Sequence, residues 1–100
     1  MAKVSWTPQA LDDIDAICLF ISRDAPEFAK IFADRAFRAT DRLATFPRSG
    51  RILPELNVDD IREIILGNYR LIYRISGNED EVHILTAHHG ARLLDPTEIT

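Results

Sequence analysis

The clearest pattern in the chain is an alternation of apolar and polar residues over residues 61–75, interrupted at Gly67-Asn68. Two alternating runs joined by glycine and asparagine predict a β-hairpin in which Leu66 lies opposite Tyr69. Side chains alternate between the two faces of such a ribbon. One face is almost wholly apolar and is expected to be covered: Arg62, Ile64, Leu66, Tyr69, Leu71, Tyr73 and Ile75. The other face is mixed and is expected to stay partly open to water: Ile61, Glu63, Ile65, Arg70, Ile72 and Arg74.

Two helices are predicted before the hairpin. Thr7-Pro8 is typical of a helix N-cap followed by a first-turn proline, and apolar residues then recur at helical spacing, which predicts a helix over 8–23. Asp24-Ala25-Pro26-Glu27 has the spacing of a capping box and starts a second helix, predicted over 26–46 and ended by Pro47. Because so few residues join the two helices, we expect an antiparallel pair.

Short strands complete the predicted fold. Residues 2–6 alternate as a first strand, residues 51–53 form a brief one, and residues 81–89 form the last. Alternation in the last strand puts Val82, Ile84, Thr86 and His88 on the covered face and His83, Leu85, Ala87 and His89 on the face of Arg70 and Arg74. A one-residue slip would exchange His88 and His89. The result is an α+β domain over residues 1–100, β-α-α followed by three or four strands, with a two-helix antiparallel hairpin on one face of a mainly antiparallel sheet.

Composition narrows the class of protein. One hundred residues with 46% hydrophobic and 28% charged content indicate one ordinary globular domain. The single cysteine, Cys18, can form no internal disulfide, which fits a reducing cytoplasm. No secretory signal or membrane-spanning run is expected. The net charge of −4 argues against a general nucleic-acid coat protein, although five arginines gather in residues 47–76: Arg48, Arg51, Arg62, Arg70 and Arg74.

Charged residues on the mixed face suggest two interpretations. In one, Arg70 or Arg74 holds a phosphate in a bidentate fork, while a histidine and a carboxylate, either Glu63 or Glu55, act as acid and base. In the other, Glu63 forms cross-strand ion pairs with Arg70 and Arg74, and residue type alone favours this second interpretation. His88-His89 do not indicate a metal site, because adjacent strand residues point to opposite faces. We expect no metal and no cofactor.

Five segments, taken in order, are similar to toxins of the RelE/ParE superfamily from type II toxin–antitoxin modules. They are Trp6–Ile14, Phe46–Arg51 followed by Leu53-Pro54-Glu55, Arg62-Glu63-Ile64, Tyr69–Arg74, and His88 or His89 with Gly90 and Arg92. The resemblance covers nearly the whole chain. It implies a small cytoplasmic toxin that is neutralised by a cognate antitoxin encoded beside it.

The resemblance implies two branches of activity. RelE-like members cleave mRNA in the ribosomal A site without a metal, whereas ParE-like members inhibit DNA gyrase and are not nucleases. Glu55, Arg70 and His89 resemble the base, phosphate clamp and acid of the nucleases. However, the chain has few lysines and no tyrosine follows His89. Its Gly50-Arg51…Pro54-Glu55 and Tyr69–Arg74 segments are more similar to the ParE or plasmid stabilisation group. We therefore predict a ParE-like gyrase inhibitor, with a RelE-like mRNA endoribonuclease as the alternative and a member that only binds its antitoxin as the second alternative.

The expected binding surface is the mixed face of the sheet. The candidate binding residues, some of which lie outside that face, are Arg51, Arg62, Glu63, Arg70, Arg74, His83, His88 and Arg92. Ile61, Ile65, Ile72 and Leu85 lie among these charged groups, and such an apolar patch commonly marks an interaction site. We expect an antitoxin segment to cover part of it. The sequence leaves the oligomeric state undecided.

Overall fold

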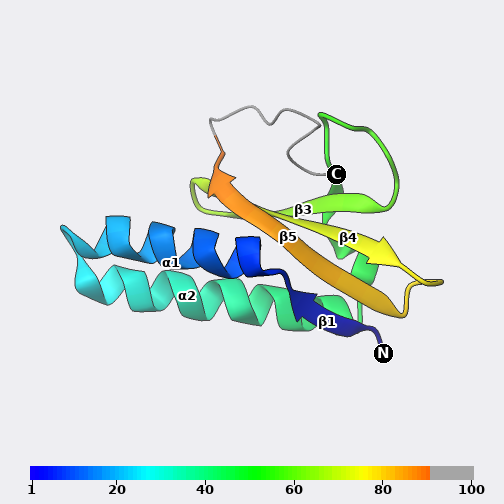
Figure 1. The fold of residues 1–100 in the computed structure, drawn as a ribbon, viewed down its shortest axis with the longest axis horizontal. Helices are drawn as coiled ribbons and strands as arrows, with labels where there is room; N and C mark the ends of the chain where they lie inside the picture. Colours follow the sequence, from blue (N-terminus) through cyan, green and yellow to red (C-terminus); the bar gives the residue numbers. More distant parts are fainter. Residues whose placement is uncertain (91–100) are drawn as a thin grey trace.

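In a computed structural model that describes residues 1–90, two helices pack on one face of a five-stranded sheet (Figure 1). The elements are β1 (Lys3–Trp6), α1 (Pro8–Ser22), α2 (Pro26–Asp41), the 3₁₀ turns η1 (Arg42–Ala44) and η2 (Pro47–Ser49), β2 (Arg51–Ile52), β3 (Ile61–Leu66), β4 (Tyr69–Ser76) and β5 (Glu81–His89). The strand order is β1-β5-β4-β3-β2. β1 runs parallel to β5 and every other pair is antiparallel, so the predicted α+β class is confirmed.

The central hairpin has the predicted register. Leu66 pairs with Tyr69, Ile64 with Leu71, and Arg62 with Tyr73. Gly67 begins the loop with a φ of 58°, a left-handed conformation that glycine adopts at little cost. The Gly-Asn loop therefore fixed both the pairing and the face of every residue in β3 and β4.

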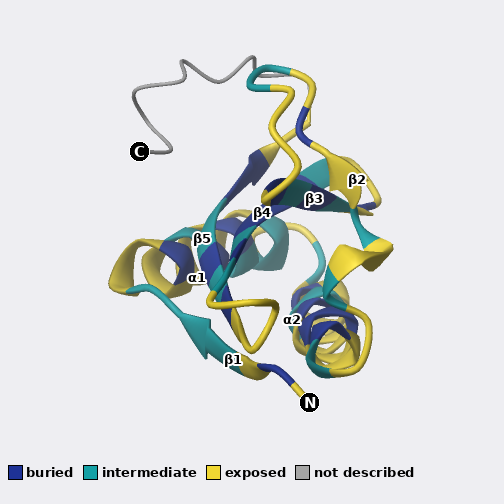
Figure 2. Cartoon of the chain, turned by 90° about the vertical axis from the view of Figure 1, so that its right-hand side faces the viewer, coloured by how far each residue is buried: buried dark blue, intermediate teal, exposed yellow. Residues whose placement is uncertain are grey.

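The main core lies between the helices and the sheet, where buried segments of both layers face each other (Figure 2). Leu43, Leu71, Tyr73, Val82 and Ile84 are fully buried there. The predicted N-cap is also confirmed, since the Thr7 hydroxyl accepts a hydrogen bond from the backbone N–H of Ala10 at 3.1 Å. No helix in residues 1–90 is long and apolar enough to span a bilayer.

Two helix predictions were wrong in detail. The N-cap of α2 is Ala25, which makes no side-chain capping bond, so Asp24 does not form the expected capping box. The chain leaves α-helical geometry at Asp41 and tightens into η1, five residues before the predicted end at Phe46. The tighter 3₁₀ turn still buries Leu43 in the core, so this apolar contact forms without a longer helix.

A β-bulge in β5 overturns the predicted alternation of the last strand. Ile72 pairs with Thr86 and Tyr73 pairs with Ile84, so Leu85 is the extra residue. Beyond the bulge the faces are exchanged: His88 lies opposite Arg70, whereas His89 lies opposite Tyr69 on the helix side. The prediction that His89 shares a face with Arg70 was therefore wrong.

The mixed face of the sheet is also less open than predicted. Leu53, in the segment that connects β2 to β3, packs with Ile61 and Ile72 in a second small core, with Leu56 and Leu85 against it. Ile61 and Ile72 are 6% and 0% exposed, while Ile65 is 50% exposed. Folding the 53–60 connection over the sheet therefore removes most of the expected apolar patch from water and leaves Ile65.

Candidate functional site

Two arginines and two glutamates form a compact ion-pair network on the mixed face, here called the Arg70 cluster: Arg51, Glu55, Glu63 and Arg70. The Arg70 guanidinium donates through both Nη atoms to the two carboxylate oxygens of Glu55, each at 2.6 Å. It also donates through Nε to Oε1 of Glu63 at 2.5 Å. Arg51 donates to the second oxygen of Glu63. The predicted ion pair of Glu63 with Arg70 is therefore present, whereas the one predicted with Arg74 is not found among residues 1–90, where Arg51 takes the second Glu63 oxygen.

Because the side chains of the Arg70 cluster are largely buried, each charge in it depends on its partners for compensation. The Arg70 side chain is 6% exposed, that of Glu63 is 0% exposed and that of Glu55 is 13% exposed. The hydrogen bonds to Glu55 raise the pKa of the Arg70 guanidinium most, and the hydrogen bond to Glu63 raises it further. Burial of the guanidinium opposes this shift. Two positive and two negative groups balance, so none is left as an uncompensated charge away from water.

The remaining predicted residues are spread over several environments. Arg74 pairs with His83 across β4 and β5, and the His83 ring is hydrogen-bonded through Nδ1 to the Ser5 hydroxyl at 3.1 Å. His88 is 8% exposed beside Arg70. Arg92 lies outside the described residues. The expected binding residues are thus not gathered on one solvent-exposed surface.

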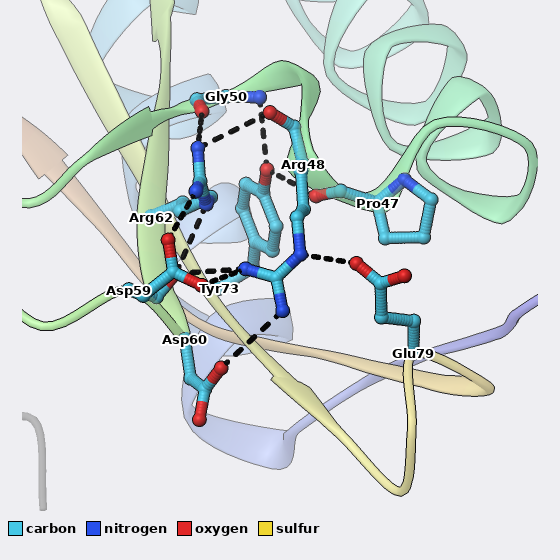
Figure 3. Close-up of polar contacts among 8 residues, drawn as sticks. All are labelled: Pro47, Arg48, Gly50, Asp59, Asp60, Arg62, Tyr73 and Glu79. Carbon is cyan, nitrogen blue, oxygen red and sulfur yellow. Dashed lines mark hydrogen bonds and ion pairs between the residues drawn. The ribbon is translucent and has the colours of Figure 1, made fainter.

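A second polar cluster, around Arg48, was not anticipated from the sequence (Figure 3). Arg48 lies against the carboxylates of Asp59, Asp60 and Glu79, and Arg62 donates to the Gly50 carbonyl at 2.8 Å. Hydrogen bonding to Glu79 is the main cause of the raised pKa of Arg48. These contacts tie η2 to the β2–β3 connection and to the β4–β5 turn, which is a structural role.

The buried Tyr73 side chain holds residues 47–50 in place through its hydroxyl group. Its hydroxyl donates to the Pro47 carbonyl at 2.7 Å and accepts from the Gly50 N–H at 2.9 Å (Figure 3). A Cβ on Gly50 would lie 2.6 Å from both the Tyr73 hydroxyl and the Glu63 carbonyl oxygen. Glycine is therefore required here because other atoms occupy the space. The local sequence does not indicate this requirement, which only the tertiary contact with Tyr73 and Glu63 explains.

A cavity of about 490 Å³ lies beside the β3–β4 turn and brings the three candidate catalytic residues together. Its lining includes Glu55, Arg70 and His89, together with Ile65 and Tyr69. Glu55 and Arg70 are paired with each other, and the His89 ring meets the Tyr69 ring edge-on, with centroids 5.5 Å apart. Among residues 1–90, no group of three or more His, Cys, Asp or Glu side chains is arranged to hold a metal ion.

A helical hairpin packed on one face of a mainly antiparallel sheet is the fold that this chain shares with solved structures of ParDE and RelBE2 toxin–antitoxin systems. A family model described as "ParE toxin of type II toxin-antitoxin system, parDE" matches residues 4–94. The chain belongs to this ParE toxin family, within the RelE/ParE superfamily that the ordered segments indicated.

Sequence relatives and solved structures agree with this assignment. The chain is 36% identical to Toxin RelE2 of Caulobacter vibrioides, covering 93% of this chain and all of the relative, and 33% identical to Y4kP of Sinorhizobium fredii, covering 86% and 88%. A structure described as a chromosomal ParDE system from P. aeruginosa superposes with a TM-score of 0.72 at 24% identity, covering 89% and 96% of the two chains. The RelBE2 toxin–antitoxin complex from Mycobacterium tuberculosis gives 0.56 at 27% identity, covering 88% and 96%.

Proposed function

We propose that this toxin acts in the ParE-like manner, by binding DNA gyrase and blocking replication, and that it does not cleave RNA. One observation carries the proposal: Arg70, the candidate phosphate clamp, is 6% exposed and is held by Glu55 and Glu63. A phosphate clamp needs guanidinium N–H groups directed at the substrate. Here those groups are directed at two carboxylates within the protein.

The same geometry weakens the case for Glu55 as a general base. Both of its oxygens accept hydrogen bonds from Arg70. A general base must direct an oxygen at the proton that it abstracts, and here both Glu55 oxygens are directed at Arg70. Catalysis would first have to break a bidentate ion pair, whereas binding a protein would leave it intact.

We further propose that the toxin works in the cytoplasm and is neutralised there by a cognate antitoxin. The similar structures are toxin–antitoxin systems, one named ParDE and one RelBE2. The exposed Ile65 and the cavity beside the β3–β4 turn offer a place for a partner. We expect antitoxin and gyrase to be bound by the protein itself, without a cofactor.

One observation favours the RelE-like alternative and makes it testable. Glu55, Arg70 and His89 line a single cavity, as an acid, a base and a clamp would. His89 is the informative position, because it is exposed and its loss should leave the fold intact. His83→Ala serves as the matched control, since His83 lies at the far end of β5.

The experiment expresses the wild type, His89→Ala and His83→Ala separately and follows DNA synthesis, protein synthesis and ribosome-bound mRNA. Under the proposal, DNA synthesis stops first, mRNA stays uncut, and His89→Ala is as toxic as His83→Ala. If ribosome-bound mRNA is cut, and His89→Ala alone slows cutting by about 10²-fold or more, the RelE-like alternative is correct. If expression affects neither process while the antitoxin still binds, the chain only binds its antitoxin.

A further inference from the structure

The first helix, α1, is held by the rest of the domain on three of its sides. Ile14 and Ile17 are buried in the main core. The Cys18 thiol donates to a carbonyl oxygen of α2 at 3.7 Å, and the Asp13 carboxylate accepts a backbone N–H of β5 at 3.0 Å. The remaining side of α1 faces away from these contacts and is exposed to solvent (Figure 2).

Four residues on this exposed side have the spacing of a coiled-coil seam. They lie four, three and four residues apart and are Asp12, Ala16, Leu19 and Arg23, here called the α1 seam. All four are exposed, Leu19 by 69%. Arg23, the C-cap, keeps helical backbone angles and so continues the stripe. Side chains spaced alternately by four and three residues form one stripe that can pack against another helix.

The two ends of the α1 seam carry opposite charges. Within residues 1–90, neither Asp12 at one end nor Arg23 at the other has an ion-pair partner within 4.0 Å. The Arg23 guanidinium lies over the ring of Phe20 on the same helix, 5.9 Å from its centroid. Asp12 and Arg23 are roughly 16 Å apart along the helix axis, which is too far for them to pair with each other. The seam therefore presents an acidic end and a basic end that another molecule can match.

We propose that the α1 seam packs against the α1 seam of a second copy of this chain, in antiparallel orientation about a two-fold axis. This orientation places Asp12 opposite Arg23 of the second copy and Ala16 opposite Leu19 of the second copy. Two-fold symmetry forms each of these contacts twice. A parallel arrangement would instead bring Asp12 against Asp12 and Arg23 against Arg23. The α1 seam is thus complementary to itself in charge and in side-chain size only when the helices are antiparallel.

The size of the seam indicates a weak and reversible dimer. α1 has 15 residues and Phe20, which is 62% exposed, adds apolar area beside the seam. Stable interfaces bury about 800 Å² on each partner, more than one face of a four-turn helix provides. We therefore expect a dissociation constant on the order of 10–100 μM.

Pairing through α1 leaves the mixed face of the sheet accessible on both copies, because the helices cover the opposite face. A dimer therefore carries two identical mixed faces, and a target with two binding sites would be held more tightly by the dimer than by one copy. The inference goes beyond the proposed function and does not depend on which target the toxin has.

Sedimentation equilibrium of the purified full-length toxin, from about 1 to 500 μM, tests the charge complementarity. Asp12→Arg makes both ends of the seam positive, and Arg23→Asp makes both ends negative. Each variant alone should raise the dimer dissociation constant at least about tenfold, because like charges meet twice in each dimer. An equimolar mixture of the two variants should dimerise within about threefold of the wild type, since each arginine then meets an aspartate. The double variant Asp12→Arg/Arg23→Asp should behave like the wild type for the same reason.

Matched controls carry the same changes in net charge elsewhere. Lys3→Asp and Glu81→Arg alter exposed residues of β1 and β5, and each alone, as well as their mixture, should dimerise like the wild type. Leu19→Ala tests the apolar centre of the seam and should raise the dissociation constant about tenfold, because its contact is lost twice. Val58→Ala, which removes apolar surface from a side chain that is 45% exposed outside the helices, should have no effect.

Each outcome decides the proposal without involving gyrase or RNA. Loss of the dimer in each charge variant, with recovery in the mixture and in the double variant, supports the α1 seam. A wild type that stays monomeric at about 500 μM would overturn the proposal. So would a dimer that responds to the seam variants no more than to the controls, since another surface would then form it. If the seam variants leave self-association unchanged and weaken binding of the cognate antitoxin instead, the antitoxin covers this surface and the proposal is wrong.

Discussion

Replacing Arg70 with methionine should destabilise the fold more than any other single change on the mixed face. Methionine keeps much of the buried apolar stem but removes three hydrogen bonds to two carboxylates. Glu63, which is 0% exposed, would then be compensated only by Arg51, whose side chain is 62% exposed. Removing one partner of a buried ion pair typically costs about 3–5 kcal/mol. Because small domains are stable by roughly 5–15 kcal/mol, this loss would be a large fraction of the total.

Urea unfolding followed by circular dichroism at pH 7 measures this effect. Arg74→Met is the matched control, because Arg74 lies on the same strand and face but is half-buried, and its cost should stay within about 1 kcal/mol. Adding Glu55→Gln and Glu63→Gln to Arg70→Met should restore part of the loss, because the amides carry no charge. If Arg70→Met costs no more than Arg74→Met, or the added amides restore nothing, the assignment of Arg70 as an internal counter-charge is refuted.

Two further predictions concern Gly50 and Tyr73. Gly50→Ala should lower the free energy of unfolding, measured in urea, by about 1–3 kcal/mol, because its Cβ would lie 2.6 Å from the Tyr73 hydroxyl and the Glu63 carbonyl oxygen, and a loss below about 0.5 kcal/mol would contradict this account. Burial raises the pKa of the Tyr73 hydroxyl above its ordinary 10.0, although the Gly50 N–H, Arg62 and Arg48 oppose the shift. The neutral hydroxyl is thus favoured in the folded state, so its contribution is complete below pH 10 and is lost as the pH rises further. Urea unfolding at several pH values should show a weaker alkaline loss for Tyr73→Phe, and an equal loss in both proteins would contradict this account.

Much of the fold could be predicted because local pattern and tertiary packing agree in the hairpin and the helices. The Gly67-Asn68 loop determined the register of β3 and β4, and the apolar stripe of α2 determined its buried face. The ion pair between Glu63 and Arg70 could also be predicted, since both residues lie on one face of neighbouring strands. These features depend on contacts between residues close in sequence.

Other features depend on contacts that no local pattern encodes. The 53–60 connection folds over the mixed face because Leu53 finds Ile61 and Ile72, and the pairing of Glu55 with Arg70 follows from that fold. The β5 bulge did leave a signal in the sequence. Ile84-Leu85 places two apolar residues side by side, which breaks the alternation where the extra residue lies.

The ion-pair partners of the arginines are stronger evidence about the toxin's target than the net charge of the chain is. Arg51, Arg62 and Arg70, which the sequence analysis named as candidate binding residues, each have a carboxylate partner within the protein. An RNA-cleaving site needs cations directed at the scissile phosphate, so arginines already engaged in this way contribute little to it. In the described part of the chain, Arg35 and Arg42 instead lie beside the exposed edge of β3. This distribution leaves few cations to hold a scissile phosphate, which agrees with the proposal that the toxin acts by binding a protein.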